Sequence, residues 1–133
     1  MDGPNLLVVD DDRSNCAIIC RTLAVQGYHV DEAFDGVSAL GLIERTSCEL
    51  AVLDYEMPGM NGVELFAEIV ARQPRIMVVF LTGFKQFNTM HPAIIAGGTP
   101  VLGKPVDFTQ LLRLIEDLVG KPMGNVRNTN GGV

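Results

Sequence analysis

The sequence predicts a doubly wound α/β fold, in which five helices cover the two faces of a five-stranded parallel β-sheet. Apolar runs of strand length alternate with segments of helical periodicity along the chain, and short right-handed connections turn that order into a parallel sheet. The run at 76–81 is apolar at every position, which is typical of a parallel strand buried on both faces. With 133 residues, of which 47% are hydrophobic, the chain suits one domain with a sizeable core.

The first half of the chain contains three predicted strands and two predicted helices. The strands are expected at Asn5–Val9, His29–Ala33 and 50–53. Asp12 is a suitable N-cap for a helix over Arg13–Val25, and Gly27 is a suitable stop for it. A second helix is expected to open after Asp35 and to run to about residue 44. The apolar residues expected on the buried faces of these helices are Cys16, Ile19, Leu23, Val37, Leu40 and Ile43.

The second half contains two more strands, at 76–81 and 101–102, and three more helices. Asn61 is expected to cap the third helix, and Asp107 begins the last one, with Gln110 three residues later as in a capping box. A weak helix is expected at 86–96, where Pro92 delays or breaks it. The apolar residues expected to face inward from the third and last helices are Val63, Phe66, Ile69, Val70, Leu111, Leu112, Ile115 and Leu118.

Acidic residues follow the first and third predicted strands. Asp10, Asp11 and Asp12 come directly after the first strand, and Asp54 ends the third. The carboxyl ends of parallel strands meet at one edge of a sheet, which is where open α/β sheets bind ligands. Carboxylates that close repel one another unless a hard cation lies between them, and Mg²⁺ prefers such oxygen ligands, with Mn²⁺ as an alternative. The pattern therefore predicts a magnesium-dependent phosphoryl-acceptor site.

Composition excludes several classes of protein. A formal net charge of −6 without a basic stripe argues against direct binding of nucleic acid. No apolar run approaches the roughly 20 residues of a membrane span, and the first residues do not resemble a signal peptide, so a cytoplasmic protein is expected. The three cysteines, Cys16, Cys20 and Cys48, lack the usual metal-ligand spacing and are interpreted as buried free thiols.

Four segments at strand ends resemble the receiver domains of bacterial two-component response regulators. The segments are Val9-Asp10-Asp11, Asp54-Tyr55-Glu56-Met57-Pro58-Gly59-Met60-Asn61-Gly62, Leu81-Thr82-Gly83 and Gly103-Lys104-Pro105. The resemblance implies a CheY-like, flavodoxin-like fold with strand order 2-1-3-4-5, a receiver domain over 4–120, and a mobile tail or the start of a linker over 121–133.

The resemblance also assigns roles to residues of the predicted site. Asp54 would be the phosphoacceptor, whose carboxylate becomes an acyl phosphate. Asp11 would bind Mg²⁺ directly, Asp10 through a bound water, and Glu56 through its backbone carbonyl, while Asp54 itself is a further ligand. Lys104 would supply the cation on the other side of the phosphoryl group. Phosphoryl transfer depends mostly on the positioning of the reacting groups and on neutralisation of the charge on the phosphoryl group.

Further residues would serve the phosphorylated state. Thr82 would donate a hydrogen bond to a phosphoryl oxygen, Gly83 would leave room for that group, and a cis peptide bond before Pro105 would aim the lysine. Receivers commonly carry an aromatic residue at the position of Val101, so the usual coupling of the threonine to that aromatic side chain is expected to be absent or altered, with activation running through 83–89. Phe84 is expected to shield the acyl phosphate and lengthen its lifetime.

The implied function is that of a switch in a two-component phosphorelay. A histidine kinase or histidine phosphotransfer protein would donate the phosphoryl group, and the receiver, which catalyses only its own aspartyl phosphorylation and dephosphorylation, would change its affinity for a target. The chain could be a single-domain regulator or a fragment of a hybrid kinase or longer regulator, and the sequence does not decide between them. It also does not decide whether the chain forms a homodimer through the face formed by 86–96, strand 101–102 and the last helix. The alternatives are a phosphorylation-independent interaction module and a small aspartyl-phosphate phosphohydrolase, which the missing threonine of an Asp-x-Asp-x-Thr motif disfavours.

Overall fold

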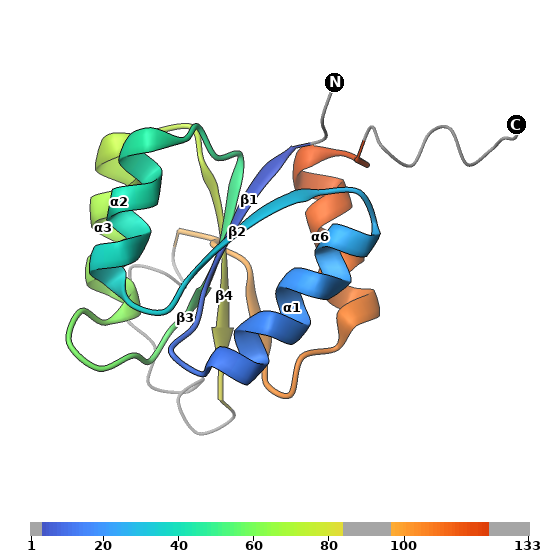
Figure 1. Cartoon of the computed structure of the whole chain (residues 1–133), viewed down its shortest axis with the longest axis horizontal. Coiled ribbons are helices and arrows are strands. Elements are labelled where there is room, and N and C mark those ends of the chain that lie inside the picture. Colours follow the sequence, from blue (N-terminus) through green and yellow to red (C-terminus); the bar gives the residue numbers. More distant parts are fainter. Residues whose placement is uncertain (1–3, 84–96, 123–133) are drawn as a thin grey trace, which may run out of the picture.

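The computed structural model describes residues 4–83 and 97–122 and contains a parallel β-sheet between two layers of helices (Figure 1). The strands are β1 (Asn5–Val9), β2 (His29–Ala33), β3 (Leu50–Asp54), β4 (Met77–Thr82) and β5 (Val101–Gly103). The helices in these residues are α1 (Arg13–Val25), α2 (Gly36–Arg45), α3 (Gly62–Arg72) and α6 (Phe108–Val119). None of these helices is long and apolar enough to cross a membrane. The predicted helix at 86–96 lies outside the described residues.

The five strands lie in the order β2-β1-β3-β4-β5 and all pair in parallel, which confirms the predicted fold class and strand order. β1 lies between β2 and the central strand β3, with Val9 opposite Leu53. Asp10, which follows β1, and Asp54, the last residue of β3, are therefore neighbours at the carboxyl edge of the sheet.

Two buried clusters, one on each face of the sheet, form the core. The alternation of side chains along each strand sends Leu7 and Val9 to one face, and Leu6 and Val8 to the other. The first face packs against α2 and α3, and the second packs against α1 and α6, as Figure 1 shows. Because β1, β3 and β4 are covered on both faces, they read as continuous apolar runs in the sequence.

The helices begin at the predicted capping residues. The side chains of Asp12, Asp35, Asn61 and Asp107 each accept a hydrogen bond from a backbone N–H three residues later. Asn61 takes part in a complete capping box, in which its N3 glutamate accepts from the Asn61 backbone N–H. These caps fix where each helix leaves the carboxyl edge of the sheet.

Two expectations from the sequence were wrong in detail. Val37 was expected to face inward, but it is 76% exposed, and α2 instead buries Gly36, Ala39 and Ile43. A Cβ on Gly36 would lie 2.9 Å from the Sδ atom of Met60, so α2 packs closely through small residues that carry little hydrophobic signal. The strand expected at 76–81 is β4, shifted by one residue to Met77–Thr82.

Gln73, which follows α3, connects three elements at the amino end of the sheet. Its Nε2 atom donates to the carbonyls of Ile43, at 2.7 Å, and Thr46, at 2.8 Å. Its Oε1 atom accepts from the backbone N–H of Cys48 at 3.0 Å. One side chain thus satisfies backbone groups at the end of α2 and just before β3.

Tyr28, the residue before β2, makes a second long-range link. Its hydroxyl donates to the carbonyl of Gly120 at 2.9 Å, which ties the end of α6 to the start of β2. Burial raises the pKa of Tyr28 to about 12, and the negative charge of Glu116 adds to that effect.

Candidate functional site

Three carboxylates meet at the carboxyl edge of the sheet. Asp10 and Asp11 follow β1, and Asp54 ends β3. Each offers a carboxylate oxygen, and these oxygens lie within 4.8 Å of one another. Asp10 and Asp54 are buried and Asp11 is exposed, so the acidic cluster is open to solvent on the side of Asp11. Oxygen donors so arranged suit a hard divalent cation.

Two hydrogen bonds hold Asp10 in place. Its Oδ1 atom accepts from the backbone N–H of Asp12 at 2.9 Å, and its Oδ2 atom accepts from the Asn15 side chain at 2.6 Å. Asp12 is the N-cap of α1 and is exposed, as expected, and Asn15 is in the first turn of the same helix. The sequence interpretation missed Asn15, whose only signal was an amide one turn into a helix that starts beside the acidic residues.

Lys104 places its ammonium group against two of the carboxylates. The residue follows β5, and its backbone N–H donates to the carbonyl of Thr82 at 2.8 Å. The peptide bond to Pro105 is cis, as expected. The Nζ atom lies 3.1 Å from Oδ1 of Asp54 and 3.7 Å from Oδ2 of Asp10. One cation therefore bridges the ends of β1 and β3.

The environment of Asp54 raises its pKa from the ordinary value of 3.8 to about 6. Burial is the largest cause, because it disfavours the charged form, and the negative charge of Asp10 acts in the same direction. Lys104 opposes them with a hydrogen bond and its charge, and the Glu56 backbone N–H, 3.3 Å from Oδ1, also lowers the pKa. Above pH 6 the carboxylate is ionised and able to act as a nucleophile.

Thr82 and Gly83 lie at the end of the neighbouring strand β4. Thr82 is buried, and its hydroxyl donates a long hydrogen bond, of 3.4 Å, to the carbonyl of Gly83. The Glu56 side chain is exposed. Val101 is half-buried on β5 and packs against the core cluster on the α2–α3 side of the sheet. Phe84 and the segment 84–89 lie outside the described residues.

The loop between Asp54 and α3 closes tightly around Gly62. The N–H of Gly62 donates to the carbonyl of Tyr55 at 3.0 Å. A Cβ on Gly62 would lie 2.8 Å from that carbonyl oxygen and 2.9 Å from the Cα of Tyr55. Because these are backbone atoms of the residue after Asp54, only glycine allows this approach. The ring of Tyr55 packs edge-on against Phe80, with centroids 5.7 Å apart.

The structure thus brings Asp10, Asp11, Asp54 and Lys104 together at one edge, with the Glu56 backbone beside them. It also places together three residues that the sequence interpretation did not group, Cys16, Cys20 and Glu32, whose ligand atoms lie within 4.8 Å of one another. The sequence signal that could have grouped the two cysteines was their spacing of four residues in a predicted helix.

Comparison with known proteins points to one family. The family model described as "Response regulator receiver domain" matches residues 6–116. The chain is 34% identical over 125 residues to the "Transcriptional regulatory protein ZraR" of Salmonella typhimurium. That match covers 94% of this chain but 27% of the relative, so the chain spans about a quarter of the relative's length.

Solved structures agree in fold with this chain. A response regulator receiver domain protein from Clostridium thermocellum superposes with a TM-score of 0.77 at 26% identity, covering 87% of this chain and 94% of that one. The chemotaxis protein CheY4 of Vibrio cholerae gives a TM-score of 0.78 at 25% identity, covering 87% of this chain and 98% of that one.

Proposed function

This chain belongs to the response regulator receiver domain family of two-component signalling, and from that membership we propose that Asp54 is its phosphoacceptor. The donor is the phosphohistidine of a histidine kinase or of a histidine phosphotransfer protein. The observation that carries the proposal is the 3.1 Å approach of the Lys104 ammonium to the buried Asp54 carboxylate, within a cluster of two further carboxylates. A carboxylate so paired is ionised, oriented and close to a cation that can neutralise the incoming phosphoryl group.

The transfer forms one bond and breaks one bond. An Asp54 oxygen attacks the phosphorus and forms the O–P bond of an acyl phosphate, while the N–P bond to the donor imidazole breaks and the nitrogen keeps the electron pair. The transition state is loose and spreads charge over the phosphoryl oxygens, so the contribution of the protein is position and positive charge. Lys104 supplies that charge from one side, with its ammonium group 3.1 Å from Oδ1 of Asp54.

The acidic cluster fits a hard divalent cation, and Mg²⁺ is the proposed one, with Mn²⁺ as a substitute. Asp11 and Asp54 would hold it directly, the backbone carbonyl of Glu56 would be the third protein ligand, and Asp10 would act through water. When bound, the cation supplies positive charge beside the phosphoryl oxygens. Asp10 is already fixed by the two hydrogen bonds that it accepts, so its carboxylate would be in place to hold such a water.

Thr82 is proposed to respond to phosphorylation. Its hydroxyl now makes one long bond to the carbonyl of Gly83, which costs little to exchange for a phosphoryl oxygen. The side chain at 101 is a β-branched valine rather than an aromatic ring and has few rotamers to exchange. Output is therefore proposed to leave the site through the segment after Gly83 and to act by changing contacts with a target protein.

The proposal is tested by phosphoryl uptake from acetyl phosphate. The intact mass of the wild-type chain should rise by one phosphoryl group when Mg²⁺ is present and should stay constant with a chelator. Lys104→Met should slow uptake about 100-fold, the scale of losing one preorganised charge donor. Lys121→Met is the matched control, since Lys121 is exposed and follows α6, and it should match wild type. If Lys104→Met takes up the phosphoryl group at the wild-type rate, Lys104 has no part in the mechanism. If the wild-type chain takes up no phosphoryl group, either from acetyl phosphate or from a phosphohistidine donor, a phosphorylation-independent module is favoured.

A further inference from the structure

Two cysteines lie on the same face of α1, against the sheet. Cys16 and Cys20 are four residues apart, so their side chains are neighbours one helical turn from each other. Cys16 is fully buried and Cys20 is half-buried. The thiol of Cys16 donates to the carbonyl of Val8 at a sulfur–oxygen distance of 3.8 Å, which places this face of the helix over β1.

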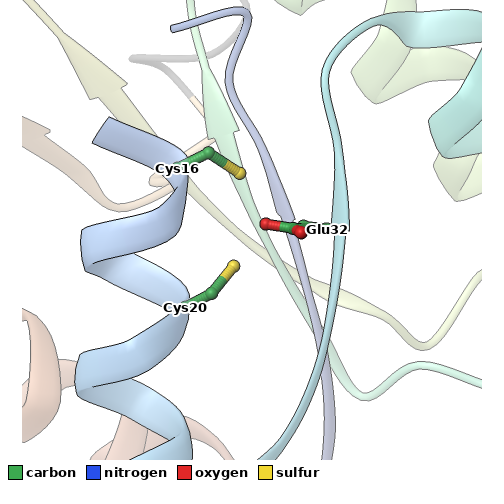
Figure 2. Close-up of side chains that lie close together, drawn as sticks. All are labelled: Cys16, Cys20 and Glu32. Atoms are coloured by element: carbon green, nitrogen blue, oxygen red, sulfur yellow. The ribbon is translucent and has the colours of Figure 1, made fainter. Parts of the chain in front are cut away.

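Glu32 reaches the same place from the edge strand β2. Val30 packs in the core cluster on the α1 side of the sheet, and side chains two residues apart on a strand share a face. The Glu32 side chain therefore lies on the side of α1. Figure 2 shows its carboxylate and the two sulfur atoms turned toward one another. One carboxylate oxygen and both sulfur atoms lie within 4.8 Å of each other.

Two members of this cluster, Cys20 and Glu32, are reachable from solvent, and Cys16 lies buried beside them. Cys20 and Glu32 line a groove of about 570 Å³ between α1 and β2, together with Arg21 and Asp31. The two thiols share a hydrogen bond that lowers the pKa of Cys16 and raises the pKa of Cys20.

We propose that Cys16, Cys20 and Glu32 bind a thiol-seeking divalent cation of the zinc class. Zn²⁺ takes cysteine sulfur at about 2.3 Å and carboxylate oxygen at about 2.1 Å in tetrahedral geometry, which sets ligand atoms roughly 3.5 to 3.8 Å apart. The separations of up to 4.8 Å need a contraction of about 1 Å, within reach of small side-chain rotations. The groove leaves the fourth position to water.

Binding exchanges protons for the metal. Each cysteine that is a thiol in the free protein forms an S–Zn bond and releases its proton to solvent, so up to two protons leave for each cation bound. The resulting centre has two thiolates and one carboxylate, and Arg21 beside the groove offsets part of the remaining negative charge. The cation joins α1 to the edge strand β2. Its ligands are all different from those of the acidic cluster, so its binding does not depend on phosphoryl transfer at Asp54.

Calorimetric titration of the full chain with Zn²⁺, in a non-thiol reductant and saturating Mg²⁺, tests the site. We expect one Zn²⁺ per chain and proton release, seen as a binding enthalpy that changes with the ionisation enthalpy of the buffer. Cys20→Ser and Glu32→Gln should each weaken Zn²⁺ binding about tenfold or more. Loss of a residue that only supports a metal ligand already weakens metal binding about tenfold or more, and loss of the ligand itself should cost at least as much. Cys20 and Glu32 are both accessible, so these variants avoid the fully buried Cys16.

Two matched variants separate this site from other cation sites. Cys48→Ser removes the remaining cysteine, which is buried elsewhere in the chain, and Asp11→Asn alters the acidic cluster, and both should bind Zn²⁺ as wild type does. Titration with Cd²⁺ should give the ultraviolet thiolate-to-metal absorption in wild type and a clearly weaker absorption in Cys20→Ser, which keeps one of the two thiols. The proposal is overturned if wild type does not bind Zn²⁺, if Cys20→Ser binds it unchanged, if Asp11→Asn abolishes binding, or if Cd²⁺ binds without thiolate absorption.

Discussion

Replacing Asp54 by asparagine is expected to stabilise the metal-free protein, and to do so increasingly as the pH rises. The side chain of Asp54 is 6% exposed, and its pKa is about 6 in the folded chain against an ordinary value of 3.8. The folded state binds this proton more tightly than the unfolded state. The carboxyl group therefore costs almost no stability well below pH 3.8, and the cost grows between about pH 3.8 and 6 and stays constant above that range. The amide of Asn has the same shape and carries no charge.

The size of the effect follows from the two pKa values. Each pKa unit corresponds to about 1.4 kcal/mol, so the ionised carboxylate costs about 3 kcal/mol at pH 7.5 and about 0.5 kcal/mol at pH 4. The attraction of Lys104 and the repulsion of Asp10 are already contained in the folded-state pKa. The variant should therefore gain about 2.5 kcal/mol over wild type between these two pH values.

Urea denaturation at a series of pH values, in the presence of a chelator, measures this difference. Asp117→Asn, at an exposed position on α6, is the control and should differ from wild type by under about 0.5 kcal/mol at every pH. Added Mg²⁺ should then raise the stability of wild type much more than that of Asp54→Asn, because a cation that binds only the folded state stabilises it by mass action. A gap between Asp54→Asn and wild type that does not grow with pH would refute the burial argument.

Three substitutions away from the carboxylates test how the fold supports the site. Gly62→Ala should destabilise the chain by about 1 to 3 kcal/mol and slow phosphorylation, because its Cβ would collide with the backbone next to Asp54; a neutral effect in urea would show that the loop yields. Gln73→Ala should cost about 2 to 4 kcal/mol in urea denaturation, since three backbone groups lose their partner, and a cost below 1 kcal/mol would mean that water replaces it. Tyr28→Phe should cost about 1 kcal/mol by the same measurement and leave phosphorylation unchanged; an altered phosphorylation rate would contradict a purely structural role.

Much of the fold was predictable because local signals and tertiary structure agree. The strand bounds at Asn5–Val9 and His29–Ala33 and the helix at Arg13–Val25 coincide with the structure, since Asp12 supplies a cap and the apolar runs have strand length. Val37 was misplaced because large side chains were taken as the buried ones. The close approach of α2 to Met60 instead selects Gly36, which carries no hydrophobic signal.

The site residues were predictable where they follow a strand. Parallel strands bring their carboxyl ends to one edge, so Asp10 and Asp54 had to be neighbours once β1 and β3 paired. The cluster of Cys16, Cys20 and Glu32 depends instead on the rotation of α1 over the sheet and on which face of β2 is turned toward it. Neither quantity can be read from residue spacing, because the edge strand carries polar residues on both faces.

The site of the phosphoryl group on the chain tests the central claim most directly. After incubation with acetyl phosphate and Mg²⁺, borohydride reduction converts an aspartyl phosphate into homoserine, which peptide mass spectrometry locates. We expect homoserine at position 54 in the wild-type chain and none in the Asp54→Asn variant. Homoserine at Asp10 or Asp11, or undiminished labelling of the Asp54→Asn variant, would contradict the assignment of Asp54 as the phosphoacceptor.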